Sequence, residues 1–226
     1  LGYTPAGVEV WNAMRALDYL ETRPEVDAKK IALTGRSGGG AITWYTAALD
    51  ERVAVAVPVH ATYTVGTQVA LDAVDENCDC IFYPNIYQED FASVGALIAP
   101  RPLKILNASR DEMFPPAGYN AIYDKVKSIY ALYHATDKIA AYDESIGHED
   151  TVSFRAQAAQ WIQQWLKQET TPFSEAGIAR EAAETLRCLA KPPADAINDS
   201  IHNSFIATPR LQRKGCAATD QRDTSA

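Results

Sequence analysis

Apolar positions along residues 1–170 follow two spacings in turn, which predicts strands that alternate with helices. Short runs that are apolar over most of their length predict strands at 30–34, 53–59, 103–108 and 139–142. Apolar residues at helical spacing predict helices at 41–49, 117–133 and 152–167. An earlier helix is expected to start at Thr4-Pro5, where an N-cap residue precedes proline at the first helical position. The alternation predicts an α/β fold, with a mostly parallel sheet and helices on both of its faces.

The pattern is interrupted at about 61–92 and decays from residue 171 onward. The first of these segments is rich in aromatic residues and lies where an insertion would form a cap over the sheet edge. The second contains one expected helix at 175–190 and ends in a polar stretch that we expect to be irregular. We therefore expect one domain over 1–170, with a cap-like insertion at about 61–92, followed by a linker and tail over 171–226.

The sequence Gly35-Arg36-Ser37-Gly38-Gly39 lies between a predicted strand and a predicted helix. It is a G-x-S-x-G motif in a strand–turn–helix setting, where a strained turn exposes the serine hydroxyl. We expect glycine at positions 35 and 39 because a side chain there would clash as the strand folds back against the helix. The motif predicts that Ser37 is a nucleophile. The alternative is a glycine-rich loop in which the serine has no role.

A nucleophilic serine needs a base, and the base needs a carboxylate to orient it. Asp111 follows the predicted strand 103–108, and His148 follows the predicted strand 139–142. Because the carboxyl ends of parallel strands meet at one edge of a sheet, we expect both side chains to lie beside Ser37. Their order along the chain, serine, acid and histidine, is that of an α/β-hydrolase triad.

The remaining histidines and carboxylates offer alternatives. His60 follows the predicted strand 53–59, so it is a second candidate base and a candidate for the pocket wall. His134 reads as a helix C-terminal cap, and His202 lies in the polar tail.

Three further carboxylates compete with Asp111 for the role of the acid. Glu112 is adjacent to it, whereas Asp143 and Glu144 precede His148 so closely that they would not reach its ring easily.

These features give the sequence a resemblance to a known family. The residues that carry it are Tyr3-Thr4-Pro5-Ala6-Gly7, the run TGRSGGG at 34–40, Leu49-Asp50-Glu51-Arg52-Val53, Cys78-Asp79-Cys80, Ala99-Pro100-Arg101-Pro102, Arg110-Asp111 and Gly147-His148. The stretch from Tyr3 to Lys167 resembles α/β-hydrolases of the acetyl xylan esterase-like, carbohydrate-esterase type, distantly related to prolyl oligopeptidases and dienelactone hydrolases. The resemblance implies that Ser37 is the nucleophile, Asp111 the acid and His148 the base, with the Gly38 N–H as one oxyanion donor.

The chain departs from that pattern ahead of the nucleophile. A complete α/β-hydrolase has several strands before the serine, and a loop after one of them supplies the second oxyanion N–H. Here the residues before Ser37 predict one helix and one strand, without a His-Gly-Gly-type loop. We therefore expect the C-terminal portion of an α/β-hydrolase fold. A natural minimal hydrolase is the alternative, and it would need another second donor.

The insertion also contains candidate substrate-binding residues. Aromatic rings can stack on sugar or aryl groups, which makes Tyr63 and Tyr83 candidates together with His60. The alternative is that these rings fill a small core of their own.

The four cysteines predict no disulfide framework. A disulfide between Cys78 and Cys80 would be strained, and two such cysteines without a second ligand pair make a poor zinc site. We expect this pair to shape the pocket wall or to be free thiols, with no metal bound.

Composition limits the range of partners. The chain has 226 residues, of which 47% are apolar, so it can bury one sizeable core. Its net charge of −8 argues against the basic face that nucleic acid requires. No run reaches the roughly 18 apolar residues of a membrane span. The expected partner is a small-molecule or carbohydrate ester, without nucleic acid or membrane.

Together these inferences predict a serine carboxylic-ester hydrolase that needs no cofactor. A sugar-linked acetyl ester, as in xylan, is favoured by the resemblance alone. The alternatives are a prolyl oligopeptidase-like serine peptidase and a truncated hydrolase scaffold without activity.

Overall fold

The computed structural model describes residues 4–74, 77–78 and 87–204. The chain divides into one compact unit over Thr4–Arg180 and a second unit to which the described residues 181–204 belong. The first unit extends past the boundary expected at residue 170. Arg155, in helix α6 (Val152–Lys167), contributes to this extension, because its Nε lies 2.6 Å from Oε1 of Glu175.

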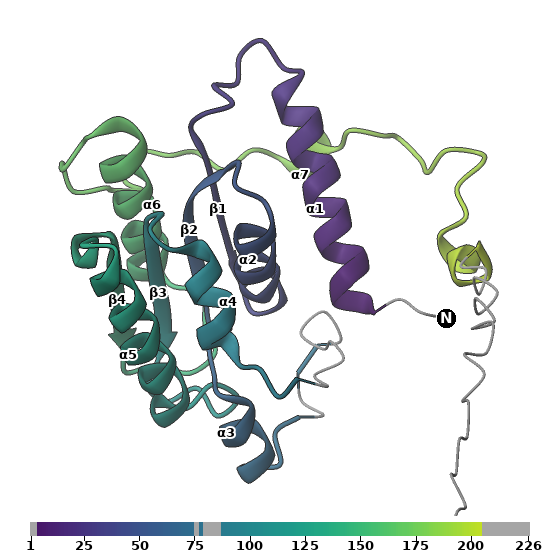
Figure 1. Ribbon diagram of the computed structural model, residues 1–226. Coiled ribbons are helices and arrows are strands. Elements are labelled where there is room, and N and C mark those ends of the chain that lie inside the picture. The colour runs from purple at the N-terminus through teal and green to yellow at the C-terminus, as the bar shows by residue number, and fades with distance from the viewer. Residues whose placement is uncertain (1–3, 75–76, 79–86, 205–226) are drawn as a thin grey trace, which may run out of the picture. The chain divides into compact units, whose positions relative to one another are not determined.

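A parallel sheet runs through the first unit in the order β1-β2-β3-β4 (Figure 1). The strands are β1 (Ile31–Arg36), β2 (Val53–Val59), β3 (Leu103–Ala108) and β4 (Ile139–Glu144). All three neighbouring pairs are parallel, so within the described residues β1 and β4 are the two edges. The predicted α/β class and parallel sheet are confirmed.

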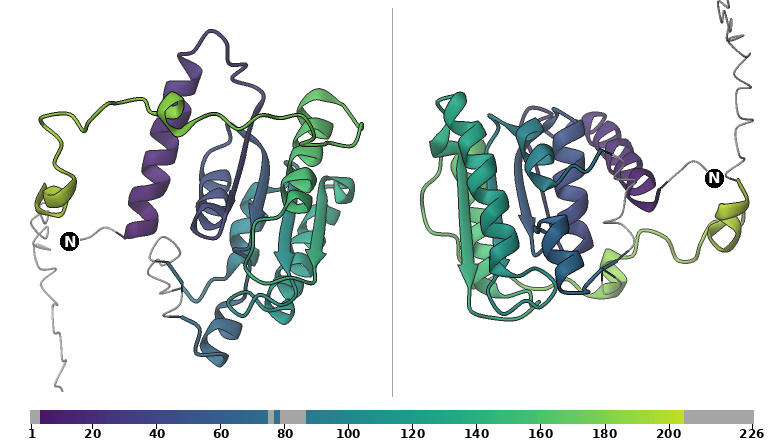
Figure 2. Two further views of the ribbon diagram at one scale, coloured as in Figure 1. Left: turned by 180° about the vertical axis from the view of Figure 1, so that it is seen from behind. Right: turned by 60° about the horizontal axis from the view of Figure 1, so that its bottom comes forward.

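Helices cover both faces of this sheet (Figures 1 and 2). They are α1 (Pro5–Glu21), α2 (Gly38–Leu49), α3 (Val65–Ala70), α4 (Phe91–Ile98), α5 (Pro116–Leu132) and α6. A 3₁₀ turn (Thr136–Lys138) follows α5. One core joins the sheet to α1, α2, α4 and α5 through side chains such as Trp44, Phe91 and Val126. The opposite face packs on α6 through Phe154 and Trp161.

Local chemistry explains where several elements begin. Thr4 caps α1 because its hydroxyl accepts the Gly7 N–H at 3.0 Å, and proline occupies the first helical position as expected. Thr151 caps α6 in the same way, through the Phe154 N–H at 3.3 Å. Strand β2 is buried along nearly its whole length, as a central parallel strand requires.

A network of charged side chains ties α1 to the start of β2. Arg52 lies 2.5 Å from Asp50, 2.7 Å from Asp18 and 2.8 Å from Glu21, and the last two belong to α1. Close by, Arg101 donates to backbone carbonyls at the end of α2 and the start of β2.

The insertion contributes to the main core instead of standing apart from it. Tyr63 and Phe91 are buried in the core that covers α2 and α4, and their rings pack against each other at 4.9 Å. Residues 75–76 and 79–86 lie outside the described part of the chain. Cys78 is disulfide-bonded, which corrects the expectation of a chain without disulfides; Cys80 is not among the described residues.

The second unit has little regular structure in its described residues. A helical turn, α7 (Ala183–Leu186), replaces the longer helix expected at 175–190, and a 3₁₀ helix covers Asn198–Ser204. The side chains of residues 181–203 are exposed, so this segment buries no apolar face that would stabilise a longer helix.

Candidate active site

Ser37 occupies the sharp turn between β1 and α2. Its backbone has φ 57° and ψ −122°, a conformation that is strained for a residue with a side chain. The Ser37 N–H donates to the Val59 carbonyl at 2.9 Å, which holds the turn against the carboxyl end of β2. Gly38 begins α2, and an N–H in the first turn of a helix has no acceptor within that helix.

Two glycines make this turn possible, but only one of them was expected. A Cβ at Gly35 would lie 2.6 Å from the backbone of Gly39. A Cβ at Gly39 itself would meet nothing within 4 Å, so the expected clash at that position is wrong. The second tight position is Gly40, where a Cβ would lie 2.5 Å from the Val59 oxygen.

Asp111 lies just past β3 and is only 3% exposed. Its Oδ2 is 2.7 Å from Nδ1 of His148 and 3.1 Å from Nδ1 of His60, and its Oδ1 accepts the Met113 N–H at 3.1 Å. Burial alone would raise the pKa of Asp111, but the hydrogen bonds from His148 and His60 outweigh burial, so this pKa lies well below its usual range. Asp111 is therefore an ionised acceptor held by three donors.

His148 lies in the loop between β4 and α6, and its side chain is 21% exposed. Asp111 occupies its Nδ1, which leaves Nε2 as the nitrogen available to a reacting group. Arg36, the residue before Ser37, donates from Nη1 to the His148 carbonyl at 3.0 Å. This contact ties the histidine loop to the serine turn.

The competing carboxylates are engaged elsewhere. Asp143 accepts the Tyr119 hydroxyl, Glu144 accepts the Ser153 hydroxyl at 2.6 Å, and Glu112 is exposed. Of the carboxylates considered from the sequence, Asp111 alone has a described hydrogen bond to a histidine.

The other two histidines, His134 and His202, have no described contact with Ser37, Asp111 or His148. His134 follows the end of α5 with φ 54°, and His202 lies in the 3₁₀ helix at 198–204; both are exposed.

The expected substrate-binding residues are placed differently. His60 is fully buried, and its Nδ1 contacts Asp111. Tyr63 is 6% exposed and packs between Phe91 and Phe114. Tyr83 lies outside the described residues.

Sequence reasoning missed the contact between His60 and Asp111. The signal was present, because both residues follow predicted strands, and those strands are neighbours in the sheet. His60, Asp111 and His148 also offer atoms within 4.8 Å of one another that could bind a metal ion. The two Nδ1 atoms lie at hydrogen-bond distances from Asp111 Oδ2, which fits two N–H donors on one carboxylate oxygen.

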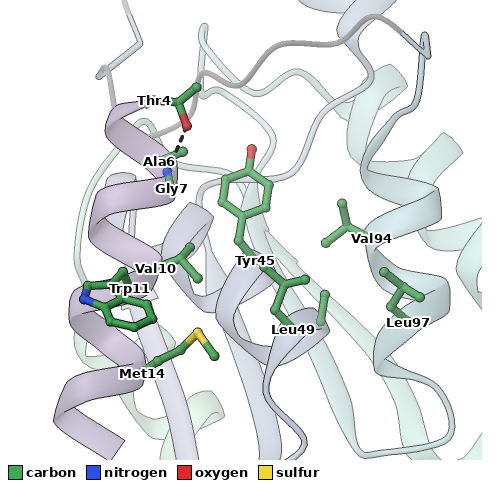
Figure 3. Close-up of a pocket in the computed structure, with 11 residues that line it drawn as sticks. Thr4, Ala6, Gly7, Val10, Trp11, Met14, Tyr45, Leu49, Val94 and Leu97 are labelled. Carbon is green, nitrogen blue, oxygen red and sulfur yellow. Dashed lines mark hydrogen bonds between the residues drawn. The ribbon is translucent and has the colours of Figure 1, made fainter. Parts of the chain in front are cut away.

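Two cavities lie beside the helices and strands described above. One, of about 320 Å³, touches the serine turn at Thr34, Gly35 and Arg36 and is closed by α6. The other, of about 420 Å³, lies between α1, α2 and α4, and its lining does not include Ser37, Asp111 or His148 (Figure 3). Its lining is mainly apolar, with Trp11, Tyr45 and Leu97 among the contributing side chains (Figure 3).

Among the described residues, none of the helices has the length and apolar content needed to span a membrane.

Comparison with known proteins extends this picture. The chain is 30% identical over 161 residues to the putative hydrolase YtaP of Bacillus subtilis (strain 168), covering 71% of this chain and 54% of that protein. Among solved structures it is similar to a carbohydrate esterase family 15 glucuronoyl esterase from Caldicellulosiruptor kristjansonii, with TM-score 0.59, 22% identity and 78% and 54% of the two chains covered. A similar match is the glucuronoyl esterase catalytic domain from Hypocrea jecorina, with TM-score 0.62, 19% identity and 75% and 54% covered.

The chain thus spans about half the length of these proteins. At such identities the structural matches establish the fold alone, a parallel sheet with helices on both of its faces. The model of the dienelactone hydrolase family matches residues 7–148, a range that includes Ser37, Asp111 and His148. The chain belongs to the dienelactone hydrolase family.

Proposed function

We propose that this chain carries the catalytic residues of a serine carboxylic-ester hydrolase, with Ser37 as nucleophile, His148 as base and Asp111 as the acid that orients it. One observation carries the proposal. A strained serine turn and an Asp111–His148 hydrogen bond of 2.7 Å both lie just past the carboxyl ends of the parallel strands. Membership of a hydrolase family supports it.

The geometry suits acyl transfer in two steps. Asp111 holds the Nδ1–H of His148, so Nε2 can accept the proton of the Ser37 hydroxyl as its oxygen attacks the ester carbonyl. The negative charge that develops on the carbonyl oxygen is stabilised by the Gly38 N–H and by a second donor outside the described contacts. His148 then gives its proton to the leaving alcohol. In the second step His148 takes a proton from water, whose oxygen attacks the acyl-enzyme. The carboxylic acid is released and the Ser37 hydroxyl is restored.

The proposed substrate is an ester attached to a sugar, with an acetyl ester favoured by the sequence resemblance. Two of the similar structures are named as glucuronoyl esterases, which supports a carbohydrate ester and makes a methyl ester of glucuronic acid the natural comparison. A peptidase of the prolyl oligopeptidase type would instead prefer short peptide amides.

The test of the chemistry is covalent labelling with a fluorophosphonate, which reacts only with an activated serine at neutral pH. Peptide mapping is expected to place the adduct on Ser37, and Ser37→Ala is expected to abolish it. An adduct on Ser109 or Ser145 would contradict the proposed nucleophile. Turnover of acetylated xylan, methyl glucuronate and a peptide anilide by the same preparation then separates the substrate classes.

A further inference from the structure

His60 has two features that are costly for a residue of the core, a buried polar ring and a left-handed backbone. It follows β2 directly, it is fully buried, and its φ of 49° lies in the left-handed region. Its N–H donates to the Leu106 carbonyl at 2.8 Å, so the turn is fixed against β3. A non-glycine residue in this conformation costs on the order of 1–2 kcal/mol, and a buried imidazole needs partners for its polar atoms. Glycine would adopt this backbone conformation without strain and without a polar ring to bury.

Of the two nitrogens of the His60 ring, only Nδ1 has a hydrogen-bond partner among the described residues. Nδ1 lies 3.1 Å from Asp111 Oδ2, the same oxygen that contacts His148, whereas Nε2 is buried without a hydrogen-bond partner among the described residues. The ring is held by Phe154 at 4.7 Å and by the His148 ring at 5.2 Å. Because an ionised carboxylate only accepts, His60 donates from Nδ1.

We propose that His60 is a positioning residue that fixes the Asp111 carboxylate for His148 by donating a second N–H to Oδ2. The inference rests on the proposed triad and adds a fourth member to it. With the Met113 N–H on Oδ1, the carboxylate accepts from three donors, which lie in the loops after β2, β3 and β4. Two donors on Oδ2 also share its charge, so the hydrogen bond to His148 is weaker than it would be with a single donor.

Two polar side chains of the surrounding elements have partners other than His60 and Asp111. Tyr119 of α5 is directed to Asp143 of β4, and Arg36 of the serine turn reaches the His148 carbonyl. Helix α6 presents the apolar ring of Phe154 to His60. The effect of His60 on Asp111 can therefore be isolated by changing His60 alone.

Asparagine and leucine make a matched pair of substitutions at this position. In His60→Asn the side-chain amide places an N–H close to where Nδ1 stands, and asparagine tolerates a positive φ. His60→Leu has a similar volume without a donor. His60→Gly is a second donorless variant, free of strain at φ 49°, in case the leucine variant does not fold.

The first readout is the proton NMR signal of a histidine Nδ1–H bound to a carboxylate, which does not depend on activity. His148 and His60 are expected to give two such downfield signals in the unmodified chain. In His60→Leu one signal is lost and the His148 signal moves further downfield, because its hydrogen bond to Asp111 becomes stronger. In His60→Asn the His148 signal is expected to stay near its original position.

The second readout is the rate of fluorophosphonate labelling at Ser37. We expect His60→Leu to slow it about tenfold, the effect of one hydrogen bond, and His60→Asn to stay within about threefold. If the leucine and asparagine variants behave alike and the His148 signal does not move, His60 is only a packing residue and the proposal is wrong.

A metal-binding role for the same three residues predicts a different outcome. Activity would then be lost on chelation and restored by added zinc, a result that would overturn the positioning role. If the proposed catalytic roles of Ser37, His148 and Asp111 are wrong, the unmodified chain will not be labelled at Ser37. The NMR signals would still report whether His60 acts on Asp111.

Discussion

Single residues of the proposed triad are expected to act as a unit. Ser37→Ala and His148→Ala should each reduce ester turnover by a factor on the order of 10³ or more, and the double variant should lose little beyond either one. Asp111→Asn should be severe as well, since it removes the acceptor that orients His148. The measurement is kcat on an aryl acetate. Near-parental kcat in His148→Ala, with loss in a His60 variant, would reverse the assignment of the base.

Lys104 provides a residue-scale prediction that is independent of catalysis. It is buried between β3 and α6, where its Nζ donates to Gln157 Oε1 at 2.6 Å and lies over the Trp161 ring. Burial lowers the pKa of Lys104, so the unfolded chain binds this proton more readily than the folded one. The charge therefore destabilises the fold at neutral pH, and stability rises as pH increases toward about 10.4, the usual lysine pKa.

Lys104→Met is accordingly expected to raise the Tm at pH 7 by roughly 2–4 °C, the shift that 1 kcal/mol gives a domain of this size. The gain should shrink as the pH approaches 10. Lys127→Met is the matched control, since Lys127 is exposed and also lies over an aromatic ring, that of Tyr123. Equal Tm shifts in both variants would show that burial of Lys104 is not the cause.

At the scale of elements, Arg101 joins the ends of three of them. Its guanidinium donates to the Val53 carbonyl at 2.7 Å, the Asp50 carbonyl at 3.2 Å and the Leu97 carbonyl at 3.3 Å, and it also reaches Ala47 of α2. We expect Arg101→Met to lower the unfolding free energy by about 3 kcal/mol, because these carbonyls lose a charged donor. Arg101→Lys should recover only part of it, since an ammonium cannot reproduce the planar fork. Urea unfolding measures both, and full recovery by lysine would contradict this account.

The elements also show what sequence patterns can and cannot predict. Strand β2 and helix α6 were predicted with their observed ends, because β2 is apolar throughout and α6 follows a capping threonine. Helix α4 was not predicted; it has only eight residues, begins where the expected insertion ends, and joins the same core as α2 and α5. The sequence placed His60 and Asp111 after two predicted strands, but periodicity within a strand does not reveal that these strands are neighbours, so their contact was missed.

At the scale of the whole molecule, the two sheet edges differ in chemistry. Strand β4 ends in Asp143 and Glu144, and charges of this kind protect an edge against pairing with other chains. Strand β1 is apolar from Ile31 to Leu33, and beside it lies the cavity that α6 also lines, whose exposed surface is mainly apolar. An unprotected edge next to an apolar hollow favours association between copies of the chain.

We therefore expect the purified 226-residue chain to form oligomers, with β1 as the contact. Thr34→Lys places a charge on an exposed position of β1 and should shift the light-scattering mass toward that of a monomer. Ala141→Lys is the matched control, because it adds the same charge at an exposed position of β4, the edge that is already protected. The control should leave the mass unchanged. A monomeric parent chain, or an equal effect of both lysines, would show that the β1 edge does not direct assembly. Because the serine turn follows β1 directly, association at this edge should also slow labelling of Ser37, and Thr34→Lys should restore it.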